Sequence, residues 1–217
     1  MIERYTLCPR RLLLTFLLFE ASMELQKNKL TGEIPSVLSD LSSLRTLQLS
    51  QNLFRGTIPP ALGYFPNLST CLCRASTCFI CKAHAFRLSS HSLPGTLFMY
   101  ANFLHSTIPT QLGDLSTLIE IDFGSNRLTG TIPSQLGKLQ VLTSLSLFDN
   151  MLTGTIPSQL ANIHTLKVLY LDSNNLGPPL PTALCNRLTF DEFWADCSAI
   201  GGCDCCTKCC QQGQTCA

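Results

Sequence analysis

Apolar and polar positions repeat along the chain with a period of 24 residues. Each repeat contains an apolar–polar–apolar triplet, and the clearest examples start at Leu47, Ile121, Leu145 and Leu169. Alternation with a period of two predicts a short strand, whose apolar side chains point into the core while the residue between them faces solvent. One strand per repeat therefore predicts a parallel sheet formed by stacking the repeats.

An asparagine follows each predicted strand, and an apolar residue with a proline comes later in the repeat. The asparagine amide can donate to and accept from backbone groups that would otherwise be buried without partners, so we expect the asparagines to form a ladder. The prolines, as in Ile132-Pro133, fix the backbone where each coil bends. The ladder asparagines are Asn28, Asn52, Asn102, Asn126, Asn150 and Asn174.

These residues resemble the leucine-rich repeat family, and specifically its plant-type class with the consensus LxxLxLxxNxLxGxIPxxLGxLxxL. The resemblance covers residues 23–184 apart from one interruption. It implies an α/β solenoid, an arc or superhelix of about six 24-residue coils with a parallel β-sheet on its concave side. Proteins of this class are mostly secreted or membrane-anchored ectodomains, including receptor kinases, receptor-like proteins and secreted inhibitors of cell-wall-degrading enzymes.

Residues 71–96 interrupt the repeat between coils 1–2 (residues 23–70) and coils 3–6 (residues 97–184). The asparagines on either side are 50 residues apart, and deleting the segment restores the register of the repeat. The segment is either a degenerate coil or loop extruded from the solenoid, or an insertion such as a translated intron. The restored register favours the insertion.

The same segment carries side chains of the types that bind zinc. All four of its cysteines lie within eleven residues, whereas zinc ribbons and fingers separate their two ligand pairs by a dozen or more. We therefore favour local disulfides or free thiols over a metal site. The residues concerned are Cys71, Cys73, Cys78, Cys81, His84 and His91.

Residues 1–22 contain three arginines, followed by an apolar run over residues 12–19. Such a run is long enough for a secretory signal and too short to span a bilayer. Glu20 is a poor neighbour for a cleavage site, and the cysteine-bearing N-terminal cap that is normal in the family is missing. The segment is thus either a signal peptide or a misannotated start.

Residues 185–217 depart from the consensus and are expected to form a cysteine-rich C-terminal cap, similar to that of leucine-rich repeat proteins from diatoms and related algae. Phe190, Phe193 and Trp194 offer apolar faces that could cover the last coil. Eight cysteines predict disulfides of undetermined pairing, rather than a metal cluster or a redox-active dithiol. They are Cys185, Cys197, Cys203, Cys205, Cys206, Cys209, Cys210 and Cys216.

Composition narrows the class of protein. With 45% apolar and 13% charged residues the chain is not intrinsically disordered. A net charge of +1 argues against nucleic acid or an anionic membrane surface as a partner. Thirteen cysteines, most of them in the cap, are typical of an oxidising extracellular compartment.

No catalytic arrangement is evident in the sequence. The four histidines have no recurring nucleophile beside them, and the glycines lie in repeat turns rather than in a phosphate-binding loop. No kinase domain is present, and no apolar stretch reaches the roughly 18 residues of a transmembrane helix. We therefore expect a non-enzymatic chain with no cofactor, no metal and no transmembrane segment.

The solvent-facing side chains of the predicted sheet are the candidates for ligand binding. Exposed aromatic residues mixed with acidic ones are typical of a hot-spot strip, although cross-strand neighbours could also merely pack sideways on one another. Asn67 begins the single N-x-S/T sequon and is the candidate glycosylation site. The ligand-binding candidates are Phe98, Tyr100, Glu120, Asp122, Phe148, Asp149, Tyr170 and Asp172.

Taken together, these features predict an extracellular leucine-rich repeat recognition module, secreted or at the cell surface. We expect it to be receptor-like, without a kinase or anchor in this chain. We expect it to bind a protein, peptide or glycan ligand on its concave face, with a co-receptor as a further partner. The alternatives are a secreted inhibitor of a hydrolase and a structural wall or matrix component cross-linked through its cysteine tail.

Overall fold

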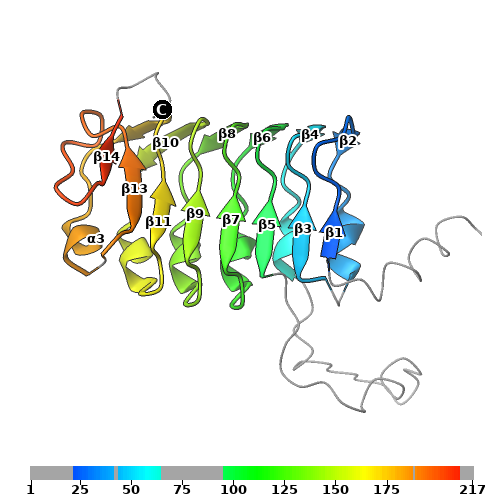
Figure 1. The fold of residues 1–217 in the computed structure, drawn as a ribbon, viewed down its shortest axis with the longest axis horizontal. Coiled ribbons are helices and arrows are strands. Elements are labelled where there is room, and N and C mark those ends of the chain that lie inside the picture. Colours follow the sequence, from blue (N-terminus) through cyan, green and yellow to red (C-terminus); the bar gives the residue numbers. More distant parts are fainter. Residues whose placement is uncertain (1–21, 42–43, 65–94, 188, 211–217) are drawn as a thin grey trace, which may run out of the picture.

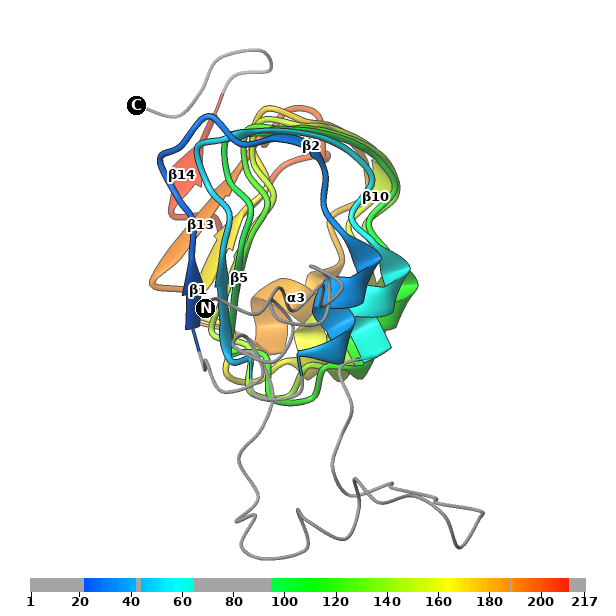
Figure 2. The same cartoon turned by 90° about the vertical axis from the view of Figure 1, so that its right-hand side faces the viewer.

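The fold is a stack of similar coils, seen side-on in Figure 1 and along the stack in Figure 2. A computed structural model describes residues 22–41, 44–64, 95–187 and 189–210. Each coil contributes a strand of a first sheet, a strand of a second sheet and a short helix, so successive coils repeat the same cross-section. The predicted signal or misannotated start at residues 1–21 lies outside the described residues.

The first sheet has eight parallel strands, which lie side by side in Figure 1. Strands β3 and β5 are hydrogen-bonded neighbours, with Leu47 opposite Leu97, although these residues are 50 positions apart. The two coils that flank the interruption are therefore adjacent in the stack, while residues 65–94 lie outside the described residues. The strands are β1 (Ser22–Glu24), β3 (Thr46–Gln48), β5 (Thr96–Phe98), β7 (Glu120–Asp122), β9 (Ser144–Ser146), β11 (Val168–Tyr170), β13 (Glu192–Ala195) and β14 (Lys208–Cys209).

A second parallel sheet of six strands corrects the expectation of one strand per coil. The residue before each ladder asparagine has a positive φ, for example 51° at Asp149, which turns the chain into the second strand. These strands bury at most one apolar side chain each, such as Leu128 on β8, and β2 buries none, so they carry almost no alternating pattern. They are β2 (Thr31–Glu33), β4 (Leu53–Gly56), β6 (Phe103–Ser106), β8 (Arg127–Gly130), β10 (Met151–Thr155) and β12 (Asn175–Gly177).

Short helices line the side opposite the first sheet (Figure 2). Each helix begins directly after the proline that recurs once per repeat. Glycines within several of the helices allow neighbouring coils to stack closely. At Gly137 an added Cβ would lie 2.4 Å from the backbone oxygen of Gln159 in the next coil. The helices are η1 (Ser36–Asp40), η2 (Pro60–Tyr64), η4 (Thr110–Asp114), η5 (Ser134–Lys138), η6 (Ser158–Asn162) and α3 (Thr182–Arg187).

The asparagines lie inside the turns between the two sheets. Asn102 donates through Nδ2 to the carbonyl oxygens of Leu49 (3.0 Å) and Met99 (3.1 Å), and its Oδ1 accepts from the backbone N–H of Phe54 (3.1 Å). Asn52, Asn126, Asn150 and Asn174 repeat this pattern between coils. Asn28, in the first coil, is exposed, and among the described residues its side chain donates only within its own turn.

The C-terminal cap continues the solenoid rather than only covering it. Phe193 on β13 pairs with Leu169 and is fully buried, and Asp196 links the cap to the last coil by accepting from the backbone N–H of Asn174. Phe190 packs on Phe193 with ring centroids 4.8 Å apart. Trp194 lies on the solvent side of the same strand, where its ring packs on Tyr170 of the last coil.

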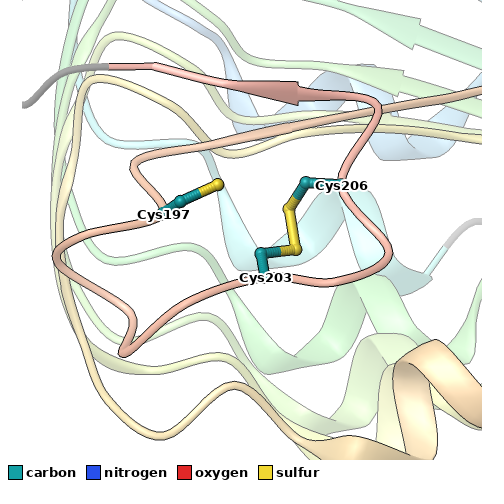
Figure 3. Close-up of side chains that lie close together, drawn as sticks. All are labelled: Cys197, Cys203 and Cys206. Carbon is teal, nitrogen blue, oxygen red and sulfur yellow. A yellow bond between two sulfur atoms is a disulfide. The ribbon is translucent and has the colours of Figure 1, made fainter.

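Disulfides hold the cap. They join Cys185 to Cys205, Cys197 to Cys209 and Cys203 to Cys206. Cys210 is disulfide-bonded as well, and Cys216 lies outside the described residues. The sulfurs of Cys197, Cys203 and Cys206 lie within 4.8 Å of one another (Figure 3). Because all three are already in disulfides, they present no thiolates that could bind a metal ion.

Candidate ligand-binding face

The solvent side of the first sheet, here called the first-sheet face, carries side chains that the parallel register places in rows. The residue between the two buried positions of each strand pairs with its equivalent on the next strand, as Phe98 does with Asp122. Eight strands thus align one such row across the sheet. The row reads Glu24, Gln48, Phe98, Asp122, Ser146, Tyr170, Trp194 and Lys208.

Tyr100 and Phe148 form an aromatic pair in the adjacent row. Their ring centroids are 5.8 Å apart at an interplanar angle of 30°, although β7 lies between their strands. Gly124, two residues after the end of β7, lies between them, and an added Cβ there would lie 2.3 Å from Cε1 of Phe148. The absence of a side chain at Gly124 therefore lets the two rings meet. The two rings therefore pack sideways on one another, as the alternative interpretation of the exposed aromatics expects, but both rings stay partly exposed.

A second aromatic cluster lies where the cap joins the solenoid. The rings of Tyr170 and Trp194 have centroids 4.7 Å apart, and Lys208 Nζ lies 4.7 Å from the centroid of the Trp194 ring. The Tyr170 hydroxyl donates a hydrogen bond to Glu192 Oε2. Burial, followed by the bond to Glu192, raises the pKa of Tyr170 to about 12, so its hydroxyl remains a donor at any physiological pH.

Acidic side chains occupy the centre of the face. Asp122 Oδ1 accepts from Ser146 Oγ at 2.7 Å and from the backbone N–H of Gly124 at 3.1 Å. Burial raises the pKa of Asp122, and these two hydrogen bonds oppose the rise. Glu120 lies two residues earlier on the same side of β7 and is half-buried, whereas Asp149 is exposed in the turn after β9.

The structure thus places most of the predicted ligand-binding residues on the first-sheet face, but one of them, Asp172, is buried. Asp172 is only 2% exposed, because it lies where the cap packs on the last coil. This burial corrects the expectation that its carboxylate faces a ligand. Asn67, the candidate glycosylation site, lies outside the described residues.

Sequence reasoning missed Trp194, Lys208 and Glu192 as members of this face. The signal was present for two of them, because Phe193-Trp194-Ala195-Asp196 follows Leu169-Tyr170-Leu171-Asp172 by one repeat length. The cysteines after this segment hid the match. Lys208 follows no repeat, since its strand is placed by the fold of the cap.

The described residues hold no arrangement suited to catalysis. His105 and His164 are exposed on different parts of the coil, one on β6 and one after η6, and His84 and His91 lie outside the described residues. Within the same ranges, no helix is both long and apolar enough to cross a lipid bilayer.

Comparison with known proteins identifies the family. The sequence profile described as Leucine Rich Repeat matches residues 43–65, 117–139, 141–163 and 165–187. The chain belongs to the leucine-rich repeat family. Its structural neighbours are plant receptor ectodomains, which makes its repeats plant-type as the consensus indicated. No curated protein sequence matches the leucine-rich repeat chain.

Three of these neighbours show what the leucine-rich repeat chain is similar to. One is the ectodomain of the Arabidopsis thaliana receptor kinase GASSHO1/SCHENGEN3 in complex with CASPARIAN STRIP INTEGRITY FACTOR 2, with 34% identity and a TM-score of 0.64 over 79% of this chain. Another is the plant peptide hormone receptor RGFR1 in complex with RGF2, with 27% identity and a TM-score of 0.65 over 80%. The third is the Arabidopsis receptor kinase HAESA with the peptide hormone IDA and the co-receptor SERK1, with 28% identity and a TM-score of 0.62 over 80%.

The leucine-rich repeat chain spans only 17%, 24% and 26% of the length of these three chains. It therefore corresponds to a section of a receptor ectodomain. The comparison supports a ligand-binding module of this family, and the ligand itself has to be argued from the chain's own residues.

Proposed function

We propose that the chain is a non-enzymatic extracellular recognition module, secreted or at the cell surface, that binds an extended peptide on its first-sheet face. The observation that carries the proposal is the pair of aromatic clusters, Tyr100–Phe148 and Tyr170–Trp194, on the same sheet face as acidic Glu120 and Asp122. Aromatic side chains provide large contact area for little loss of conformational freedom, and they dominate binding hot spots.

The face is organised before any ligand arrives. Gly124 admits the Phe148 ring, Ser146 holds the Asp122 carboxylate, and Glu192 accepts from the Tyr170 hydroxyl. Side chains that are already ordered lose less entropy on binding, so more of the contact energy appears as affinity. The carboxylates favour a peptide that presents basic side chains between apolar ones.

The peptide is preferred to the other ligand classes because the neighbouring ectodomains are described in complexes with peptide hormones. A co-receptor is a further proposed partner, because the HAESA complex contains the co-receptor SERK1 together with the peptide hormone IDA. A glycan ligand and inhibition of a secreted hydrolase use the same face and are the competing forms of recognition.

A structural role through cysteine cross-links is less favoured by the cap. Six of its cysteines form three disulfides within the chain, so these sulfurs are unavailable to a second molecule. A cross-linked component would also not require an ordered set of aromatic and acidic side chains on an open sheet.

Selection from a displayed library of random dodecapeptides tests the proposal. We expect enriched peptides with basic and apolar residues, whose affinity falls at least tenfold in the Phe148→Ala and Tyr170→Ala variants. Val141→Ala is the matched control, because Val141 is an exposed apolar residue away from the first sheet. Peptides that bind all three variants equally would remove the first-sheet face as the site. A preference for wall oligosaccharides over every peptide would replace the ligand class.

A further inference from the structure

A second group of ordered side chains lies on the outer face of the second sheet. Phe103 on β6 sits between two arginines, with Cζ of Arg55 at 5.8 Å and Cζ of Arg127 at 5.2 Å from its ring centroid. Arg55 comes from β4 and Arg127 from β8, on either side of β6. Cation–π contacts with this one ring thus bring two guanidinium groups, with their several N–H donors, to the same part of the sheet.

The charge of this face is opposite to that of the first sheet. Glu33, which pairs with Arg55 in the register, is the one acidic residue in the six strands of the second sheet. His105 on β6 and exposed Lys29 just before β2 add to the basic character. The first-sheet strands instead carry four acidic residues and one lysine, namely Glu24, Glu120, Asp122, Glu192 and Lys208.

Neither guanidinium is committed to a carboxylate within the described part of the chain, where the one salt bridge joins Lys138 to Asp114. The two arginines that flank the Phe103 ring therefore present positive charge, which an anionic ligand would complement. Arginine forks also bind carboxylates with paired hydrogen bonds. The charge of this face therefore complements an acidic partner.

Apolar side chains flank the arginines. Leu53 on β4 is 39% exposed and Met151 on β10 is 49% exposed. An acidic polysaccharide would leave these two side chains in water, whereas a peptide can cover them with apolar side chains of its own. The combination favours an acidic protein segment that also presents apolar residues.

We propose that the Arg55–Phe103–Arg127 stack, with Leu53 and Met151, is a second docking surface that binds an acidic, partly apolar segment of a protein partner. This surface lies on a different sheet from the ligand-binding face. A single molecule could thus hold a basic ligand on one sheet and an acidic partner on the other.

The test uses a fluorescein-labelled synthetic peptide in which Glu-Glu-Leu is repeated four times, and measures fluorescence polarisation on titration with the full chain. We expect saturable binding that weakens as salt is raised and that falls at least tenfold in the Arg55→Gln/Arg127→Gln variant. The matched control is Lys138→Gln/Lys167→Gln, which removes the same charge from exposed lysines elsewhere. Its affinity should stay within twofold of the parent chain.

Further arms decide the class of partner. The Leu53→Ser/Met151→Ser variant should lose at least threefold, and an oligogalacturonate of similar charge should bind more weakly than the peptide. If the arginine double variant and the lysine double variant lost the same affinity for the peptide, the binding would depend only on net charge, and the proposal would be overturned. Tighter binding of the oligogalacturonate, with no effect of the serine variant, would replace it with a polysaccharide site. Self-association abolished by the arginine variant would replace it with a contact between two copies of the chain.

These results can be separated from those for the first-sheet face. Phe148→Ala should leave binding of the acidic peptide unchanged. Phe148 follows β9 of the first sheet and belongs to the first-sheet face, not to the second docking surface. Thermal unfolding of each variant confirms that any loss of binding does not come from loss of the fold.

Discussion

The ring of Phe148 lies over Gly124 and fills the space that a Cβ at residue 124 would need. That Cβ would come within 2.3 Å of Phe148 Cε1 and 2.6 Å of Cδ1. A glycine in one coil therefore places the aromatic side chain of the next, and it brings Phe148 to Tyr100 across an intervening strand. Gly124 thus shapes the aromatic surface of the first-sheet face.

We expect Gly124→Ala to move the Phe148 ring away from Tyr100 at little cost in stability, because the ring edge is a movable side chain. Gly137→Ala is the matched substitution, where the added Cβ would instead lie 2.4 Å from the backbone oxygen of Gln159. Backbone in a stacked coil cannot move aside, so Gly137→Ala should destabilise the fold by about 2 kcal/mol. Urea unfolding and nuclear Overhauser contacts between the two rings measure both effects. Equal stability of the two variants would contradict this account.

The asparagine ladder makes its own prediction. Asn150→Ala leaves the carbonyl oxygens of Phe123, Leu147 and Phe148 and the backbone N–H of Leu128 without this partner. We expect a loss of about 3 kcal/mol in the free energy of unfolding. Asn28→Ala in the first coil should cost about 0.5 kcal/mol or less, because Asn28 is exposed and bonds only its own turn. Similar costs at both positions would show that the ladder does not couple coils.

The disulfides of the cap should differ in their contribution to stability. The Cys185–Cys205 bond closes a loop with a sequence separation of 20, and the Cys203–Cys206 bond one of 3. The loss of chain entropy in the unfolded state then predicts about 3 kcal/mol for Cys185→Ser/Cys205→Ser and about 2 kcal/mol for Cys203→Ser/Cys206→Ser. Chemical denaturation of the two double variants measures the difference, and a larger cost for the shorter loop would oppose the prediction.

The raised pKa of Tyr170 predicts a dependence on alkaline pH. Because the folded chain keeps the proton to about pH 12 while the unfolded chain releases it near its ordinary pKa of 10, stability should fall as pH rises between these values. The stability difference between the parent chain and Tyr170→Phe should change over this window and stay constant below it. Glu192→Gln should lower the pKa of Tyr170, as followed by phenolate absorbance. An unchanged titration would mean that Glu192 does not hold the hydroxyl.

Much of the first sheet was predictable because most coils bury two apolar side chains in a fixed register, one in the strand and one just after it, as Leu145 and Leu147 show. The second sheet was not, since a strand such as β8 buries Leu128 alone and depends on its neighbours for the rest. Alternation of apolar and polar residues predicts a strand only where one side of that strand is buried and the other faces solvent.

The candidate site was predictable in outline and not in detail. Strand register alone places Phe98, Asp122 and Tyr170 in one row. The burial of Asp172 and the position of Lys208 depend on how the cap packs, which no short pattern encodes. The approach of Phe148 to Tyr100 depends on the absence of a side chain at Gly124.

The central claim, that the first-sheet face binds a peptide, can be tested through one side chain. Trp194 is the sole tryptophan of the chain and lies on this face against Tyr170 and Lys208. Titration with a peptide selected for binding should change the Trp194 emission saturably, with the same dissociation constant that calorimetry gives. Binding seen by calorimetry while the Trp194 emission stays constant, and persisting in full in Tyr170→Ala, would contradict the claim.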